Sequence, residues 1–358
     1  MVKFSMETGK MAGVKLQDVA AKVGVSLATA SLALSGKGRV SPDMRARVRA
    51  AAAALGYTAR IAPRGRVAAA AGNVAILRFE DRDYEWSFIH PILSELEQNL
   101  IAKGYAPVSV PVGLKMPPER VRDMIRSTRS RAVFSVHYGN GRLFEELEAE
   151  GIRLVVVNNS SFQDRFYSVC VDDFQGAYEG ALYLIGLGHR AIAFVEYERP
   201  DQPGVIADRF VGFRKALDEN RLAFSAEQRI TIRFMDEARL AKKLGTLFAR
   251  AERPTAIFSH DDYLGMFVIS ALKDLGLGVP DDVSLIAPGD VLDYSIPCTP
   301  QITTMRINTA LLGRTAASLM LDRLNNERKD VHVLKVKEQL VRRSTCRKVE
   351  QEGRGGRG

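Results

Sequence analysis

The side chains best suited to hold a small polar molecule stand in four stretches, each after a short apolar run. These stretches read SVHYG, VVNNS, FSHDD and APGD, and they contain His137, Asn158, His260, Asp261 and Asp290. In parallel sheets ligands bind beyond the carboxyl ends of the strands, where each of these residues is predicted to lie. Carboxylate groups at such a place would hydrogen-bond the hydroxyls of a sugar or of another small polar ring.

Each of these residues also has an ordinary structural interpretation. His260 can be a hydrogen-bonded loop histidine, and the pair Asp261–Asp262 can cap a helix. The aspartate pairs at 172–173 and 281–282 can do the same. The pattern therefore indicates a binding site at the strand ends and leaves simple capping as the alternative.

The sequence shows no recognisable motif for catalysis or for a metal centre. It contains no G-x-x-x-x-G-K-[ST] phosphate loop, no G-x-S-x-G nucleophile elbow and no H-E-x-x-H motif. Its five histidines are scattered, and Cys170, Cys298 and Cys346 lie too far apart to suggest a disulfide framework or a Cys-x-x-Cys site. We therefore expect reduced cysteines, no enzymatic activity, no cofactor and no metal.

Two further observations bear on where the protein acts. No stretch approaches the roughly 18 consecutive apolar residues of a membrane helix. The first residues, MVKFSMETGKMAGV, lack the apolar segment of a signal peptide. We expect a cytoplasmic protein with no membrane partner.

Positive charge is concentrated at the start of the chain. Residues 1–72 contain twelve Lys and Arg against three acidic residues, whereas basic and acidic residues balance over 73–358, so the net charge of +9 belongs to the first fifth. A basic module joined to a neutral body is typical of a nucleic-acid binder with a separate regulatory or catalytic domain. A solubilising N-terminal arm would give the same distribution of charge.

Three helical patterns account for the chain up to about residue 55. Apolar residues recur at helical spacing over 16–22, and Gly24 ends this pattern. Ser26 is a good N-cap for a second helix that reaches about residue 34. Ser41 followed by Pro42 begins a third helix, which ends near residue 55.

Small residues at the first joint fit a helix-turn-helix. Two helices that cross over a tight turn need Ala20 at the crossing and Gly24 in the turn, with Val25 and Ala30 in the core between them. The outer face of the second helix would then enter the major groove of DNA. Helical pairs of this pattern also occur in bundles, and the concentrated positive charge is what favours DNA.

From Asn73 onward, short apolar runs alternate with amphipathic helices. This alternation predicts parallel sheets with helices on both faces, and the length predicts two similar lobes. The predicted strands cover 74–77, 106–110, 132–136, 154–157, 191–195, 230–234, 256–259 and 283–287.

The expected organisation is an all-α headpiece followed by a doubly wound α/β domain. We expect a flexible extension over 1–13, a helix-turn-helix headpiece over 14–58, a hinge over 59–72, an effector-binding and dimerisation domain over 73–345, and a disordered tail over 346–358. The two lobes are expected to comprise 73–169 with 295–322, and 170–294 with 323–345.

The stretch VKLQDVAAKVGVSLATASLALSGKGRVSPDMRARVRAAAAALGY resembles the headpiece of LacI/GalR (lactose/galactose repressor) transcription factors. Their pattern is D-V-A-x-x-A-G-V-S-x-x-T-V-S, a loop, V-S-x-x-T-R-x-x-V and a closing L-x-Y. Five later segments match the family in its order: GLGHRAIAFV, RFVGFRKAL, RPTAIFSHDD, GLGVPDDVSLIAPGD and TPQITTMRINTALLG. The resemblance implies two lobes like those of type I periplasmic binding proteins, with a small effector between them, in a homodimer that binds a palindromic operator in double-stranded DNA.

The resemblance also assigns DNA contacts. Hydroxyl and cationic side chains at these positions would bond phosphates, which sets register and carries little sequence information. The base-reading positions hold Leu27, Ala28 and Leu32. At the position of Leu32, many relatives have a long polar residue. None of the three can make bidentate hydrogen bonds to bases, so we predict a recognition helix that packs against thymine methyl groups and leaves more of the specificity to DNA shape. The full set is Lys15, Ser26, Leu27, Ala28, Thr29, Ser31, Leu32 and Arg39.

The hinge departs from the family pattern. Relatives have a Pro-Asn pair, then Ala-Arg and a Leu that wedges into the minor groove, whereas this chain has Pro63-Arg64-Gly65-Arg66, with Arg66 at the wedge position. Pro63 and Gly65 disfavour a helix interior by roughly 3 and 1 kcal/mol relative to Ala, which predicts a weak hinge helix or one that starts at Pro63. Arg64 and Arg66 either enter a narrow minor groove or are solvated linker charges.

Three more effector-site residues come from the resemblance. Arg209 in RFVGF matches the ligand-clamping arginine, and Trp86 and Phe88 stand where relatives line the pocket, although Trp86 could equally be core. The chain departs from the family at His260, usually Asn, and at Gly289, often Asp. The resemblance implies a repressor whose operator affinity depends on a small polar effector, such as a sugar or a sugar derivative.

Two other classes of protein would share these lobes. A solute receptor should carry an export signal and lack a basic headpiece, and this chain shows the reverse. An α/β enzyme would need a catalytic set in the cleft, and none is visible.

Overall fold

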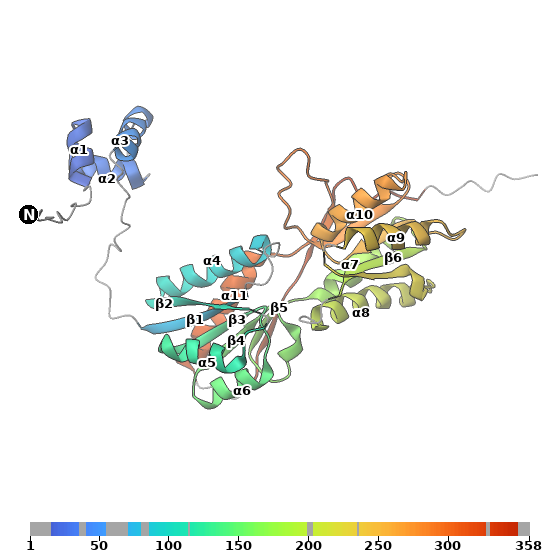
Figure 1. Cartoon of the computed structure of the whole chain (residues 1–358), viewed down its shortest axis with the longest axis horizontal. Helices are drawn as coiled ribbons and strands as arrows, with labels where there is room; N and C mark the ends of the chain where they lie inside the picture. The colour runs from blue at the N-terminus through green and yellow to red at the C-terminus, as the bar shows by residue number, and fades with distance from the viewer. Residues whose placement is uncertain are drawn as a thin grey trace, which may run out of the picture. The chain divides into compact units, whose positions relative to one another are not determined.

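The computed structural model describes residues 16–35, 41–54, 71–79, 86–113, 115–198, 203–234, 236–326 and 330–349. Two compact units make up the chain, residues 1–67 and residues 68–358 (Figure 1). The predicted extension over 1–13 and the hinge residues 59–70 lie outside the described residues.

The described part of the first unit consists of three short helices: α1 (Leu16–Val23), α2 (Leu27–Ser35) and α3 (Pro42–Ala54). Their shared core is made of Val and Ala side chains, which allow the helix axes to approach closely. Pro42 at the first position of α3 follows Ser41, whose Oγ accepts a hydrogen bond from the Met44 amide at 3.3 Å. The three predicted helices are thereby confirmed to within one or two residues. The core contains Val19, Ala20, Ala30, Ala33, Val48, Ala51 and Ala52.

The second unit contains two six-stranded sheets with helices on both faces (Figure 1). Paired strands run parallel, except that the last strand, β12, is antiparallel to β10. The first sheet has the order β11-β5-β4-β3-β1-β2 and the second has the order β12-β10-β9-β8-β6-β7. This doubly wound α/β architecture confirms the predicted fold class.

Strand and helix bounds follow the chain. The first sheet is formed by β1 (Gly72–Phe79), β2 (Tyr105–Val112), β3 (Ser130–Val136), β4 (Arg153–Val157), β5 (Ser168–Val171) and β11 (Val333–Val336). Its helices are α4 (Trp86–Ala102), α5 (Pro118–Ser127), α6 (Gly141–Ala149) and α11 (Thr309–Asn325). The second sheet is formed by β6 (Ile192–Tyr197), β7 (Arg229–Ile232), β8 (Ala256–Ser259), β9 (Ser284–Gly289), β10 (Thr303–Arg306) and β12 (Gln339–Val341). Its helices are α7 (Asp173–Gly186), α8 (Pro203–Glu219), α9 (Glu237–Phe248) and α10 (Asp262–Asp274), and short 3-10 turns cover Ser160–Phe162 and Ala226–Gln228.

Each sheet has an apolar core on both faces. Helices α4 and α11 cover one face of the first sheet, and α5 and α6 cover the other. Helices α7 and α8 pack on one face of the second sheet, with α9 and α10 on the other. Because both faces are covered, strands such as β4, β6 and β8 read as continuous apolar runs, which is the pattern that made them predictable.

The chain passes between the two sheets at Asp172, at residues 307–308 and at residues 337–338. The amide of Asp172 donates to the carbonyl of Val336 at 2.9 Å, so the first and third passages lie side by side. These passages join two lobes, and any movement of one lobe against the other must bend them.

The predicted lobe boundaries are wrong in two places. Residues 303–306 were expected in the first lobe, but they form β10, which pairs with β9 in the second sheet. Residues 333–336 were expected in the second lobe, but they form β11, which pairs with β5 in the first. The exchanged segments are short strands whose partners lie far away in the sequence, so their sheet is chosen by tertiary pairing.

The predicted tail also begins too early. Cys346 donates from Sγ to the Leu285 carbonyl at 3.0 Å, and the Val349 amide donates to the Leu187 carbonyl at 2.8 Å. Residues 346–349 therefore pack on the second lobe, and residues 350–358 lie outside the described part. No helix in the described ranges is long and apolar enough to cross a membrane.

Candidate nucleic-acid interface and effector site

The joint between α1 and α2 has the geometry that its small residues predict. Gly24 has φ +73°, a left-handed conformation that favours glycine, and the Val25 amide donates to the Ala20 carbonyl at 3.0 Å. Ala20 is 4% exposed and Ala30 is fully buried, so the two helices meet through their smallest side chains.

Ser26 is the N-cap of α2. Its Oγ accepts a hydrogen bond from the Thr29 amide at 3.1 Å, and the two hydroxyls bond each other at 2.8 Å. Both hydroxyls were predicted to contact phosphates. In the free headpiece they stabilise the first turn of the helix, and their contact with DNA stays a prediction.

The exposed face of α2 is apolar. Leu27 and Leu32 are 54% and 39% exposed, whereas Ala30 and Ala33 on the opposite face are fully buried. The helix carries no charged residue, and in the flanking helices Lys22 and Arg47 are exposed.

The remaining predicted DNA contacts cannot be placed. Ala28 and Ser31 belong to α2, but their side chains are outside the described set. Lys15, Arg39, Arg64 and Arg66 lie outside the described residues altogether.

In the first lobe, two predicted effector residues meet at neighbouring strand ends. His137 follows β3 and Asn158 follows β4, and the Asn158 Nδ2 lies 2.8 Å from the His137 Nε2. With the amide nitrogen as donor, Nε2 accepts and the ring proton is on Nδ1. Both residues are buried and have positive φ angles, 62° and 55°, which non-glycine residues rarely adopt.

Aromatic residues of α4 stand next to this pair. The Phe88 ring lies 5.5 Å from the His137 ring at a tilt of 57°. Trp86 begins α4, but its side chain is outside the described set. The first lobe therefore brings His137, Asn158 and Phe88 together.

In the second lobe, Arg209 of α8 is buried in a dense polar cluster. Its Nε and Nη2 each lie 2.8 Å from Oδ1 of Asp173, the first residue of α7. Its Nη1 donates to the His260 carbonyl at 2.7 Å and lies 3.4 Å from the His260 Nε2. Arg209, Asp173 and His260 are all more than nine-tenths buried. The guanidinium is therefore held rigidly at the carboxyl end of β8.

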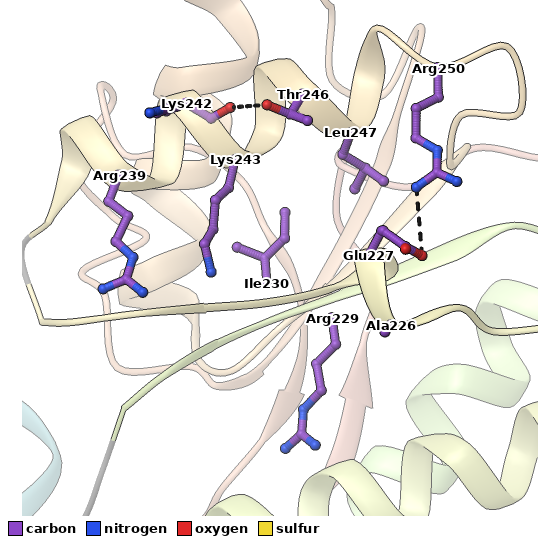
Figure 2. Close-up of a pocket in the computed structure, with 10 residues that line it drawn as sticks. All are labelled: Ala226, Glu227, Arg229, Ile230, Arg239, Lys242, Lys243, Thr246, Leu247 and Arg250. Atoms are coloured by element: carbon purple, nitrogen blue, oxygen red, sulfur yellow. Dashed lines mark hydrogen bonds and ion pairs between the residues drawn. The ribbon is translucent and has the colours of Figure 1, made fainter.

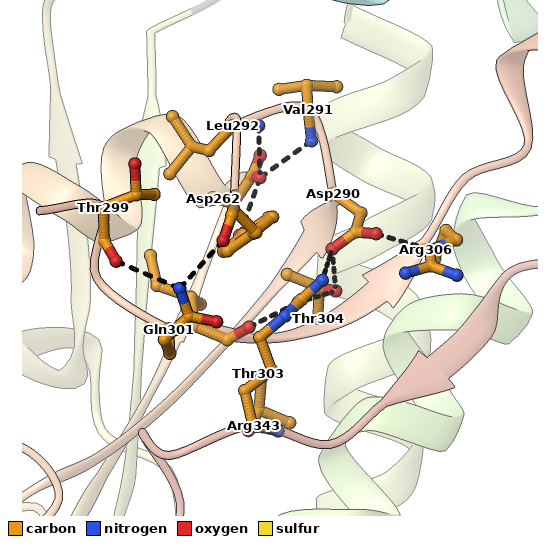
Figure 3. A network of polar contacts seen from close by, with 12 residues as sticks. Asp262, Asp290, Val291, Leu292, Thr299, Gln301, Thr303, Thr304, Arg306 and Arg343 are labelled. Carbon is orange, nitrogen blue, oxygen red and sulfur yellow. Dashed lines mark hydrogen bonds and ion pairs between the residues drawn. The ribbon is translucent and has the colours of Figure 1, made fainter. Parts of the chain in front are cut away.

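The neighbouring aspartates of FSHDD have separate structural roles. Asp261 is the N-cap of α10, and its Oδ1 accepts from the Leu264 amide at 2.7 Å, so the capping interpretation is confirmed for this residue. Its contact with an effector stays a prediction. Asp262 is fully buried, and its Oδ2 accepts from the amides of Val291 and Leu292 and from the Tyr294 hydroxyl (Figure 3). Burial raises the pKa of Asp262 to about 6 in spite of these donors.

Asp290 follows β9 and its carboxylate is already occupied. Oδ1 accepts from the Thr304 hydroxyl at 2.8 Å and lies 2.6 Å from the Arg343 Nη2, while Oδ2 pairs with Arg306 (Figure 3). Burial alone would raise the pKa of Asp290, but the hydrogen bonds from Arg306, Thr304 and Arg343 lower it. Asp290 thus braces β9, β10 and the segment after β12, and its contact with an effector stays a prediction.

Sequence reasoning missed Asp173 and Glu338 as members of this region. Asp173 belongs to an aspartate pair that reads as a cap, and only the fold brings it to Arg209. Glu338 lies on the third passage between lobes and is 6% exposed, and neither of its carboxylate oxygens has a hydrogen-bond partner in the structure. Burial raises the pKa of Glu338 well above its usual range, with Arg209 opposing and Asp173 adding to the shift. No local pattern could have indicated this, because Glu338 is buried only by the meeting of distant segments.

In the described ranges, no three His, Cys, Asp or Glu side chains come together as ligands for a metal ion.

Comparison with known proteins finds a family match in each of the two units. Residues 15–59 match the lacI family of bacterial regulatory proteins, and residues 181–346 match the periplasmic binding protein-like domain. The HTH-type transcriptional repressor PurR of Pectobacterium atrosepticum is 29% identical over 332 residues, which cover 92% of this chain and 95% of the relative. The chain thus joins a helix-turn-helix domain of the lacI family to a periplasmic binding protein-like domain. This confirms the resemblance on which the predicted headpiece and lobes depended.

Solved structures of the LacI family share the fold. The transcriptional regulator CelR–cellobiose complex has a TM-score of 0.67 at 24% identity and covers 93% of this chain and 99% of the other. The lac repressor dimer bound to operator and the anti-inducer ONPF has a TM-score of 0.66 at 20% identity, with 94% and 100% covered. These likenesses show that the chain has their fold. The relative from Pectobacterium atrosepticum is a transcriptional repressor, and the matched N-terminal domain is that of bacterial regulatory proteins.

Proposed function

We propose that this protein is a cytoplasmic homodimeric LacI-family repressor whose affinity for a palindromic operator is controlled by a small polar effector bound between its lobes. The effector class that fits best is a sugar or a sugar derivative. One neighbour in fold was solved with cellobiose, and a LacI-family regulator from Enterococcus faecium was solved with ribose. The predicted domains stand as the parts of this proposal: headpiece 14–58, hinge 59–72 and a two-lobed sensor after residue 73.

The observation that carries the effector proposal is the rigid burial of Arg209. A guanidinium has five N–H donors, and the contacts to Asp173 and His260 leave donors for the oxygens of a ligand. Burial costs a charged group free energy, and such an arrangement is retained in a sensor when it recognises a polar ligand.

The first lobe supplies a complementary surface. His137 and Asn158 offer an imidazole and an amide, and Phe88 beside them offers an aromatic ring. Positive φ at His137, Asn158 and Asp290 places strained backbone at three of the four strand ends where an effector is expected. An effector that contacts both groups would draw the lobes together and bend the passages at 172–173 and 337–338.

The coupling that this mechanism requires is modest. A hundredfold change in operator affinity corresponds to about 2.7 kcal/mol of difference in effector binding between the two lobe arrangements. One or two hydrogen bonds that form in only one arrangement supply free energy of this size.

The DNA-binding half of the proposal is tested by selection of bound fragments from genomic DNA, followed by anisotropy titration against the best fragment and a random duplex. We expect the purified protein to prefer a two-fold symmetric site by at least about a thousandfold at moderate salt. Equal affinity for both duplexes, whatever small molecules are added, would contradict it.

The effector half is tested with the same selected site. Candidate metabolites are screened for a melting shift, and those that shift it are added to the operator titration. Arg209→Lys should keep operator affinity and lose the response, because a lysine cannot bond Asp173 and a ligand as a planar fork. Arg214→Lys on the same helix is the control, since its pair with Asp218 is partly exposed. An undiminished response in Arg209→Lys would refute this site.

A further inference from the structure

A hollow of about 470 Å³ lies on the second lobe between β7 with its preceding turn and α9 (Figure 2). Its volume falls within the range of pockets that hold small organic ligands, about 300–1,000 Å³. It is lined by Ala226, Glu227, Arg229, Ile230, Arg239, Lys242, Lys243, Thr246, Leu247 and Arg250. Five of these side chains are cationic and one is acidic.

Two cations project from α9 into the hollow. Arg239 and Lys243 lie side by side and descend from the helix toward β7 (Figure 2). Lys243 is held in place because its Nζ donates to the Thr231 carbonyl at 2.9 Å, which uses one of its three donors. Arg239 has Nη1 3.5 Å from Glu198, a longer separation than a charge-assisted hydrogen bond of about 2.7–2.9 Å.

A third cation closes the other end. Arg250 faces Glu227 with Nη1 and Oε2 3.6 Å apart, another loose pair. By contrast, the Arg214–Asp218 pair of the same lobe is 2.6 Å long. The guanidinium groups of Arg239 and Arg250 therefore keep donors that a tighter anion could take.

Arg229 lines the hollow, but its guanidinium does not point into it. Its guanidinium leaves on the other side of β7 (Figure 2), where Nε donates to Glu196 at 2.6 Å and the group stacks on Phe210 at 3.6 Å. The Lys242 side chain does not point toward β7 either (Figure 2). The side chains that face the space are then the cationic Arg239, Lys243 and Arg250 and the acidic Glu227.

The floor of the hollow is apolar. Ile230 and Leu247 are 2% and 3% exposed, and Figure 2 shows them between the Arg239–Lys243 end and the Arg250 end. The aliphatic stems of Lys243 and Arg250 extend this surface, as long cationic side chains do. An occupant would thus meet positive charge at its ends and apolar atoms along its body.

We propose that this hollow is a second ligand site, which takes a phosphate monoester carried on a flat apolar body. A phosphate dianion neutralises two adjacent cations, whereas a carboxylate neutralises only one. The planar guanidinium of an arginine also matches the spacing of the phosphate oxygens. The site shares no residue with the proposed effector site, whose members follow the carboxyl ends of the strands, whereas Ala226 and Glu227 precede β7. The proposal of this second site does not depend on the proposed function.

The test is a calorimetric titration of the full-length protein with phenyl phosphate, inorganic phosphate and benzoate. We expect saturable binding of one phenyl phosphate per chain, with inorganic phosphate and benzoate each weaker by about tenfold or more, because each lacks one half of the recognition. Arg239→Met and Lys243→Met keep the apolar stems and should each weaken phenyl phosphate by about tenfold.

Two control variants locate the binding. Lys273→Met removes an exposed lysine of α10 outside the hollow, and Asn158→Ala alters the proposed effector site. Both should bind phenyl phosphate like the unaltered protein, and melting midpoints of all four variants check that they fold. Absent binding, equal binding of phosphate and phenyl phosphate, or loss in Asn158→Ala but not in Lys243→Met would overturn the proposal.

Discussion

Leu27 and Leu32 limit how the headpiece can read DNA. Both are exposed on α2, and neither can donate or accept a hydrogen bond. In the proposed operator complex, discrimination between bases comes from contact with thymine methyl groups and from exclusion, while phosphate contacts set the register.

The first prediction concerns Leu32. Leu32→Ala should lower operator affinity by about tenfold and relax base preference at one position in each half-site, because apolar contacts worth about 1.4 kcal/mol in total over the two half-sites are lost. The measurement is selection from a random duplex library, followed by titration. Leu275→Ala removes a comparably exposed leucine from the second lobe and should change neither. Unchanged preferences in Leu32→Ala would mean that this side chain does not read bases.

The second prediction concerns Glu338, whose pKa is raised by burial. Between the unfolded pKa near 4.3 and the raised folded value, the native state holds a proton that the unfolded chain releases, so stability falls as pH rises. Glu338→Gln removes this proton exchange. Above about pH 5, the free energy of unfolding of the unaltered protein should fall with rising pH relative to that of the variant, with a slope of at most about 1.4 kcal/mol per pH unit for one proton.

Urea unfolding at a series of pH values measures this difference. Glu97→Gln, an exposed change on α4, serves as the control and should run parallel to the unaltered protein. A parallel course for Glu338→Gln would show that Glu338 is ionised in the native state.

At the scale of elements, the contact between α7 and α8 places the Arg209–Asp173 pair. Gly212 stands one turn after Arg209, and a Cβ there would lie 2.1 Å from the carbonyl oxygen of Phe174, the residue after Asp173. The two helices can approach this closely only because residue 212 has no side chain.

The third prediction follows from this close approach. Gly212→Ala should push α8 away from α7, destabilise the protein by about 1–3 kcal/mol and weaken the effector response, since overpacking cannot be relieved against backbone. Gly245→Ala in α9 is the matched control, because its nearest neighbour would be 3.5 Å away. That change should be neutral or stabilising by up to about 1 kcal/mol. Denaturant unfolding and effector titration of both variants measure the contrast, and equal stabilities would contradict the packing argument.

At the scale of the whole molecule, the positive charge is confined to one part of the chain. The basic excess lies in residues 1–72 and the body is neutral, so long-range attraction to DNA belongs to the headpiece and hinge. A neutral body adds no sequence-independent attraction to DNA that would mask the influence of the proposed effector on the operator complex.

The fourth prediction is a steep salt dependence of operator binding. Affinity should fall by about a thousandfold between about 50 and 200 mM salt, because phosphate contacts release counterions. Arg39→Gln should reduce the slope of log affinity against log salt by about one for each headpiece that contacts DNA. Lys273→Gln in the body should leave the slope unchanged, and a weak dependence in the unaltered protein would argue against phosphate-driven binding.

Local signals were enough to predict the headpiece and most of the body from sequence. Helix starts at Ser26 and Ser41 depend on side chains that bond their own helix within three residues, and fully buried strands such as β4 read as apolar runs. Arg209 was recognised from its motif, and the structure shows it buried at a strand end. Each of these features depends on residues that lie close together in the sequence.

Only the tertiary structure shows which sheet the short C-terminal strands join and which distant side chains meet. Strands β10, β11 and β12 have three or four residues each, too few to show a period, and their partners determine which lobe they join. The same holds for Asp290, whose carboxylate is taken by Arg306 and Arg343, and for Glu338, which is buried where two passages meet. A side chain's neighbours across a fold depend on pairings between distant segments, and no spacing along the chain records them.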